Sequence, residues 1–171
     1  MSEKEPLEPP VLLNPSHRAD EFDCGVDALN AYLKRFASIN NQNGSARTYA
    51  ALRGNQVAGY YTVTPGSVSK EEAPPRIGQG LARHPVPVIL LARLAVDKKE
   101  KGQGLGRELL RDVLIRVVHA ADSIGGRALL VHAKDEPAKS FYEHFGFEPS
   151  PLDPFHLYLL IKDIKKTLRL D

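Results

Sequence analysis

The chain has 171 residues, of which 42% are hydrophobic and 26% are charged, and its formal net charge is +2. These values are ordinary for a globular protein, and so small a net charge cannot identify a nucleic-acid partner by itself. The single cysteine, Cys24, excludes an internal disulfide framework and is expected to be a buried structural thiol. No apolar run approaches the roughly 20 residues of a membrane span, and the polar start resembles no signal peptide, so the expected location is cytoplasmic.

The first half of the chain predicts a helix followed by a β-hairpin. Residues 27–37 form an amphipathic pattern whose apolar members recur at helical spacing: Leu29, Tyr32, Leu33 and Phe36. The polar run 39–44 breaks that pattern. Residues 47–52 and 56–63 read as two strands joined by a hairpin turn. Residues 65–87 are rich in proline and glycine, which predicts a loop with room for a short helix.

The second half alternates strands with helices. Residues 86–96 predict a buried central strand, and a long amphipathic helix is expected from about Gly104 onward. A strand over 127–132 and a helix over 135–145 follow, and the last strand spans 155–161 before a basic tail. This order of elements predicts an α/β domain with a mixed sheet.

The most informative segment is the glycine-rich loop between the central strand and the long helix. Glycines at 102, 104 and 106 allow the backbone to bend sharply and to approach a ligand closely. The helix that follows directs unpaired N–H groups and the positive end of its dipole to the same place, so the loop is predicted to bind an anion. The segment lacks the Lys-Ser/Thr end of a P-loop, and Arg107 stands where a dinucleotide fingerprint has its third glycine.

A second motif lies in the helix expected over 135–145 and reads Ala138-Lys-Ser-Phe141-Tyr142-Glu-His-Phe145-Gly146-Phe147. Helical spacing predicts that Ala138, Phe141 and Phe145 form the buried stripe. Tyr142 is then about 100° around the helix, where its hydroxyl can reach a neighbouring cleft. A phenol is neutral at pH 7 and can donate a proton, although a purely structural tyrosine is the alternative.

Together the two motifs resemble those of the GNAT acetyltransferases, in which Arg/Gln-x-x-Gly-x-Gly/Ala lies between a strand and a helix, and A-x-x-F-Y-x-x-x-G-F follows. Lys101 stands in the place usually held by Arg or Gln. The resemblance covers roughly residues 11–160. It implies the GNAT fold, with a mixed, mostly antiparallel central sheet flanked by helices, and we expect one domain over 11–171 behind a disordered extension at 1–10.

The resemblance also implies acetyl-CoA as co-substrate, with no metal, and assigns the site residues. Tyr142 is implied to be the general acid that protonates the departing thiolate. The cofactor-binding residues carried over are Leu94, Ala95, Val96, Lys101, Gly102, Gln103, Gly104, Gly106 and Arg107. No general base is apparent, since His132 is more plausibly a packed or capped residue at a strand end, and a water chain would serve.

Arg93 is unusual because it places a guanidinium in an otherwise apolar central strand. Such a group must be paired or must face a polar cleft, since burying it alone is very costly. Two interpretations are equally supported: a substrate-binding residue, or a structural salt bridge with an acidic residue at a strand end.

A closer resemblance connects the chain to the GNAT toxins of bacterial toxin–antitoxin pairs. The segments that carry it include Phe22-Asp-Cys-Gly25, Val57-Ala-Gly59-Tyr60-Tyr61-Thr62 and Leu91-Ala-Arg93-Leu-Ala-Val96. It implies acetylation of the α-amino group of aminoacyl-tRNA, which blocks translation, and neutralisation by a ribbon-helix-helix antitoxin. We also expect a homodimer. Candidate substrate contacts are Arg76, Arg83, Arg93, Lys165 and Lys166, although a solvated basic face is equally consistent with these residues.

Two other functions are compatible with the same motifs. One is a GNAT enzyme for a small amine or a protein N-terminus, which needs the same core. The other is a non-catalytic module that binds acetyl-CoA, against which the retention of Tyr142, Gly104 and Gly106 argues.

Overall fold

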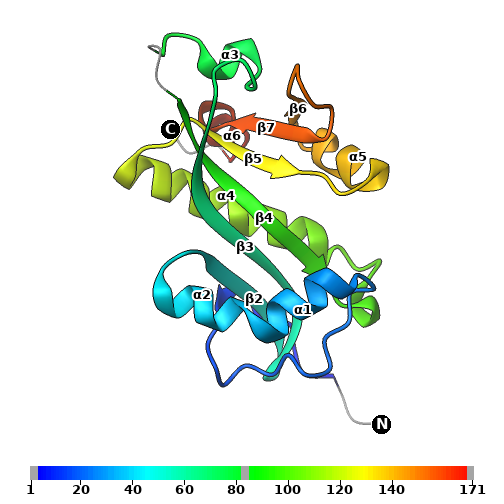
Figure 1. The fold of residues 1–171 in the computed structure, drawn as a ribbon. Coiled ribbons are helices and arrows are strands. Elements are labelled where there is room, and N and C mark those ends of the chain that lie inside the picture. Colours follow the sequence, from blue (N-terminus) through cyan, green and yellow to red (C-terminus); the bar gives the residue numbers. More distant parts are fainter. Residues whose placement is uncertain (1–3, 82–84, 169–171) are drawn as a thin grey trace. The chain divides into compact units, whose positions relative to one another are not determined.

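The computed structural model describes residues 4–81 and 85–168 (Figure 1). The chain forms two compact units, the first built from Met1–Thr64 and Ala92–Val113, and the second from Pro65–Leu91 and Leu114–Asp171. Three long elements contribute residues to both units: β3 (Gln56–Val68), β4 (Val86–Val96) and α4 (Leu105–Ile124). In its described part, the chain has no helix long and apolar enough to cross a membrane.

The first unit places two short helices, α1 (Asp27–Arg35) and α2 (Ala37–Asn43), before the strand β2 (Arg47–Arg53), and α2 packs against β2 (Figure 1). The predicted break at 39–44 was wrong, because α2 continues to Asn43 and ends at Gly44 with φ 79°. This run lacks apolar periodicity because polar contacts hold it: Asn41 donates to the Leu13 carbonyl oxygen at 3.0 Å and accepts from the Thr48 amide at 2.8 Å.

The hairpin of β2 and β3 is antiparallel, as predicted, and its turn uses Gly54 with φ 62°. The short edge strand β1 (Val11–Leu12) pairs with β2, and the Glu8 amide donates to the Leu52 carbonyl oxygen at 2.7 Å. The core of this unit gathers large side chains from α1 and the strands with Cys24, which is buried as expected.

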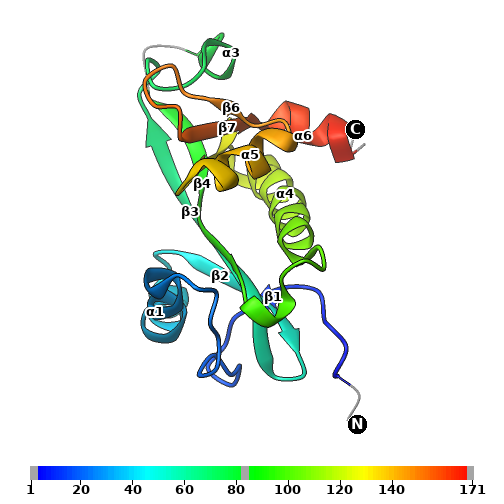
Figure 2. The same cartoon turned by 90° about the vertical axis from the view of Figure 1, so that its right-hand side faces the viewer.

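In the second unit, β4 pairs in parallel with β5 (Ala128–His132), and β5 pairs antiparallel with β7 (His156–Leu160). The strand β6 (Glu148–Pro149) lies at the edge beside β7 (Figure 2). The strand order is β1-β2-β3-β4-β5-β7-β6, and the pairing is mostly antiparallel, which confirms the predicted fold class.

Two predictions for the second unit need correction. The segment predicted as a loop begins instead with the end of β3, which runs to Val68, whereas the short helix for which the prediction left room is present as α3 (Pro75–Gly78). The predicted basic tail is instead a helix, α6 (Ile161–Leu168), because Ile161 and Ile164 are buried one turn apart. Two turns are too few to establish a period in the sequence.

Candidate active site

The glycine loop lies between β4 and α4, as the sequence predicts. Gly102 and Gly104 have φ values of 81° and 83°, which side chains with a Cβ rarely adopt. A Cβ added at either position would meet no atom within 4 Å, so the space beside both glycines is open. Gly106 is already within α4, which begins at Leu105. The first turn of α4 and the open loop therefore offer backbone N–H groups to an anion.

Hydrogen bonds of Asp97 and Lys101 hold the start of this loop in place. The buried Asp97 carboxylate accepts from the Lys99 amide at 2.8 Å and from the Asp23 amide at 3.2 Å. The Lys101 ammonium donates to the Cys24 carbonyl oxygen at 3.2 Å. Sequence reasoning missed Asp97, although an aspartate that directly follows a strand is a typical cap for a helical turn. Because Lys101 has three N–H donors, this contact leaves it two for a phosphate.

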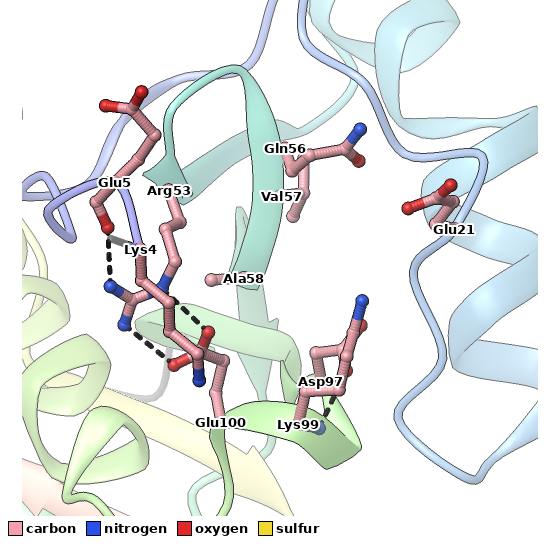
Figure 3. Close-up of a pocket in the computed structure, with 10 residues that line it drawn as sticks. All are labelled: Lys4, Glu5, Glu21, Arg53, Gln56, Val57, Ala58, Asp97, Lys99 and Glu100. Carbon is pink, nitrogen blue, oxygen red and sulfur yellow. Dashed lines mark hydrogen bonds and ion pairs between the residues drawn. The ribbon is translucent and has the colours of Figure 1, made fainter. Parts of the chain in front are cut away.

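One pocket of the first unit has a volume of about 260 Å³, and Asp97, Lys99 and Glu100 are among the residues that line it (Figure 3). Arg53 crosses it and donates two hydrogen bonds of 2.9 Å to the Glu100 carboxylate. None of the predicted cofactor residues lines it. Its charged residues are the acids Glu5, Glu21, Asp97 and Glu100 and the bases Lys4, Arg53 and Lys99. An excess of acids disfavours a pyrophosphate, so the glycine loop stays the predicted anion site.

The strand β4 supplies the backbone predicted to hold the acetyl and pantetheine groups. Its pairing with β5 runs from Val88↔Ala128 to Leu91↔Val131, so residues 94–96 lie beyond that ladder. In the first unit, a Cβ at Gly59 would lie 3.1 Å from the Ala95 carbonyl oxygen and 3.0 Å from Leu109 Cδ1. Gly59 thus permits a close approach of β3 to β4 and α4, which explains a glycine inside a strand.

Arg93 does not form a structural salt bridge with any described acidic residue, so that interpretation of the sequence is wrong, whereas substrate binding stays a prediction. Its guanidinium carbon lies 3.6 Å from the centroid of the Tyr32 ring, a cation–π contact with α1. Across residues 4–81 and 85–168 it has no acidic partner, and its side chain is half-buried. A guanidinium stacked on a ring keeps its in-plane N–H donors for a ligand.

Tyr142 is the buried residue of α5 (Glu136–His144), whose first turn is capped by the Asp135 carboxylate at 2.9 Å from the Ala138 amide. The predicted stripe was wrong, because Phe141 is only half-buried whereas Tyr142 is 7% exposed. The Tyr142 ring packs edge-on against Phe141 and Phe147. Burial raises the pKa of the Tyr142 hydroxyl above its ordinary value, and no residue in the described ranges hydrogen-bonds to it.

The predicted tRNA contacts of the second unit gather around α6. Arg76 binds Asp163 at 2.8 Å and Glu148 at 3.3 Å, and Lys165 binds Asp122 at 2.6 Å. Lys166 is exposed and has no acidic partner within the described chain. Arg83 lies outside the described residues. Arg76 and Lys165 therefore already have ion pairs, although both side chains remain partly exposed at 51% and 38%.

Comparison with known proteins decides the family. A family model described as an acetyltransferase (GNAT) domain matches residues 44–149. The chain belongs to the GNAT acetyltransferase family. A tRNA-acetylating toxin of Mycobacterium tuberculosis is 47% identical to this GNAT chain over 159 residues, which cover 93% of this chain and 95% of the relative. The predicted fold and acetyltransferase class are confirmed.

Two solved structures of the toxin AtaT show the same GNAT fold. One is AtaT complexed with acetyl-methionyl-tRNAfMet, which is 28% identical with a TM-score of 0.88 and covers 95% of this chain and 99% of that one. The other is a tyrosine-to-phenylalanine mutant of AtaT bound to the C-terminus of the antitoxin AtaR and acetyl-CoA. It is 27% identical with a TM-score of 0.82 and covers 96% of this chain and 99% of that one.

Proposed function

We propose that this GNAT acetyltransferase is a toxin that transfers the acetyl group of acetyl-CoA to the α-amino group of aminoacyl-tRNA and so blocks translation. The observation that carries the proposal is the 47% identity to a tRNA-acetylating toxin over nearly the whole chain. The glycine loop supports the cofactor half of the proposal, since its open positive-φ backbone suits a pyrophosphate.

Acetyl-CoA binding is assigned to two adjoining segments. The loop residues Lys101, Gly102, Gln103, Gly104, Gly106 and Arg107 would hold the pyrophosphate through backbone N–H groups and side-chain cations. The backbone of Leu94, Ala95 and Val96 would hold the pantetheine arm and polarise the thioester carbonyl. In that arrangement the protein supplies charge stabilisation where the carbonyl oxygen becomes negative.

Tyr142 is assigned to the leaving group. When the substrate amine attacks the thioester carbon, the C–S bond breaks and the sulfur leaves as a thiolate, which a nearby O–H donor stabilises and protonates. Burial keeps the Tyr142 phenol protonated, so the donor is present whenever the thiolate develops. Because its hydroxyl has no partner among the described residues, nothing in them competes for its proton.

The resemblance to GNAT toxins also implies the binding partners of the enzyme, which are charged tRNA, an antitoxin and a second copy of the chain. The acceptor end of the tRNA would bring its amine to the thioester, with its phosphates contacting Arg76, Arg83, Arg93, Lys165 and Lys166. A ribbon-helix-helix antitoxin would neutralise the enzyme in the cytoplasm, and the toxin would act as a homodimer. The solved structure of an AtaT mutant bound to the C-terminus of the antitoxin AtaR supports an antitoxin partner for this chain.

The test is to offer labelled acetyl-CoA together with bulk charged tRNA, polyamines and a peptide pool in separate reactions. The proposal predicts label in the charged tRNA and none in uncharged tRNA, because only the aminoacyl ester carries the amine. Label confined to polyamines or peptides would instead identify an acetyltransferase for a small amine or a protein N-terminus. Acetyl-CoA binding without transfer to any pool would identify a non-catalytic module.

A further inference from the structure

Two histidines stack at one end of the second unit. His132 is the last residue of β5 and His156 is the first residue of β7, and the antiparallel register places them opposite each other. Their ring centroids are 4.0 Å apart and the rings are inclined by only 15°. His132 is exposed, whereas His156 is half-buried beneath it. The stack therefore presents one imidazole to solvent and fixes the other.

His156 is fixed by carboxylates at both of its nitrogens. Its Nδ1 lies 2.7 Å from Glu72 Oε1, and its Nε2 lies 3.4 Å from Asp153 Oδ2. A carboxylate oxygen therefore lies beside each ring nitrogen of His156, and the two contacts set the orientation of its ring. Ser150 holds Glu72 in turn, because its hydroxyl donates to the Glu72 carbonyl oxygen. The ring of His132 stacks on the ring of His156, which these contacts hold in place.

The same neighbours control the charge of His132. Partial burial and the adjacent His156 lower the pKa of His132, and Glu72 and Asp153 oppose that effect without cancelling it. His156, Glu72 and Asp153 are the titratable groups that act on its pKa. His132 is therefore a neutral proton acceptor at pH 7, held in place and open to solvent.

The position of His132 in the sheet matches a role in the chemistry. It directly follows Val131, whose pairing with Leu91 is the last between β5 and β4. Strand alternation puts His132 on the same face as Leu130, which packs in the cluster that contains Ile77 of α3. The helix that carries Tyr142 ends on the opposite face, since a Cβ at Gly146 would lie 3.7 Å from Leu159. His132 and the helix that carries Tyr142 thus lie on opposite faces of the β5–β7 pair.

We propose that His132 is the general base of the transfer and that His156 is its positioning residue. The inference rests on the proposed function, whose substrate is an aminoacyl amine. As the amine nitrogen bonds to the acetyl carbon and the C–S bond breaks, His132 takes the surplus proton from that nitrogen. Tyr142 gives its proton to the thiolate, and solvent then returns the proton of His132 to the phenolate. The products are the N-acetyl amide and the free thiol of CoA.

The experiment is a pH profile of kcat/KM with bulk charged tRNA, from about pH 5 to pH 9, which brackets the titration of histidine. His132→Gln should lower kcat/KM by about 10²-fold or more. His156→Phe keeps a stacked ring but removes a neighbour that lowers the pKa of His132, so the acid limb should move to higher pH. The substrate amine adds an acid limb of its own, which neither variant shifts. His119→Gln, an exposed change on α4, is the matched control and should behave as wild type.

Folding is checked by the melting temperature and by acetyl-CoA affinity, and His132→Asn provides a second variant. An NMR titration of the labelled histidines measures the pKa of His132 without substrate. That pKa should lie below the ordinary histidine range in the wild type and should be higher in His156→Phe. A His132→Gln enzyme with the rate and pH profile of the wild type would overturn the inference while leaving the proposed function intact. If the label enters polyamines or peptides instead of charged tRNA, the proposed function fails. The pH profiles of kcat/KM for the wild type and the variants are then measured with that amine as substrate, which still tests the role of His132.

Discussion

The guanidinium of Arg93 lies 3.6 Å from the centre of the Tyr32 ring, so a cation in the middle of β4 is held by an aromatic side chain of α1. Tyr32 is itself fixed, because it is buried and its hydroxyl accepts from Asn40 Nδ2 at 3.1 Å. This support needs no acidic residue and leaves the charge of Arg93 uncompensated among the described residues. An anionic substrate is the natural complement.

Replacing Arg93 with Gln should lower kcat/KM for charged tRNA at least about tenfold, which is the loss expected for one charged hydrogen bond to a phosphate. Acetyl-CoA affinity should not change. Tyr32→Phe keeps the ring face and serves as the matched control, with activity close to wild type. Equal loss of activity toward a small amine and charged tRNA in Arg93→Gln would contradict the assignment of this residue to the anionic substrate.

Gly104→Asp should abolish measurable acetyl-CoA binding, because it adds a negative carboxylate where the pyrophosphate is placed. Gly80→Asp is a matched control, since Gly80 also has a positive φ of 80° and open space beside it. Both variants carry the same backbone strain, and only the first should affect calorimetric titration with acetyl-CoA. Unchanged affinity in a folded Gly104→Asp protein would disprove the phosphate site.

Tyr142→Phe should lower the turnover rate by about 10²-fold or more and leave the melting temperature nearly unchanged. The substitution removes one oxygen and no ring volume, and no described residue loses a hydrogen-bond partner. Tyr158→Phe is the control, because Tyr158 is also buried with a hydroxyl that has no partner among the described residues. If both variants kept full activity, the thiolate would take its proton from water.

Glu100→Gln should lower the free energy of unfolding at pH 7 by about 1–3 kcal/mol, since it weakens a bidentate, largely buried pairing with Arg53. The Arg53 hydrogen bonds hold the pKa of Glu100 below its ordinary value of 4.5. A depressed carboxyl pKa contributes stability above the unfolded value and loses it as the pH falls through the folded value. The difference between the two proteins in urea unfolding should therefore shrink below about pH 4. A constant difference across that range would show that the ion pair is not its source.

Binding of charged tRNA should weaken steeply as salt rises, whereas turnover of a small amine should not. Lys166→Glu should lower tRNA affinity without regard to sequence, because Lys166 is exposed and has no acidic partner in the described ranges. Charge reversal at Lys165 should cost less affinity, since Asp122 already neutralises that residue at 2.6 Å. Equal effects of the two reversals would indicate that the tRNA displaces the Asp122 contact.

The features that the sequence predicts well are those that local chemistry determines. A positive φ favours glycine, and it occurs in the turn at Gly54 and in the loop at Gly102 and Gly104. The start of α5 likewise needs a side chain that can accept a backbone hydrogen bond, which Asp135 supplies. The features that it misses depend on distant partners. Asn41 stabilises α2 through residues of two other segments, and the partners of Arg76 lie on β6 and α6. The stack of His132 on His156 likewise exists only in the folded sheet.

The most direct measurement is the chemical location of the label after reaction with labelled acetyl-CoA and charged tRNA. The account predicts that the label enters the RNA fraction and that mild alkali, which cleaves the aminoacyl ester, releases it as N-acetyl amino acid. Tyr142→Phe should reduce that product by about 10²-fold. Label that remains on the RNA after ester cleavage, or that appears only in peptides or polyamines, would contradict the account.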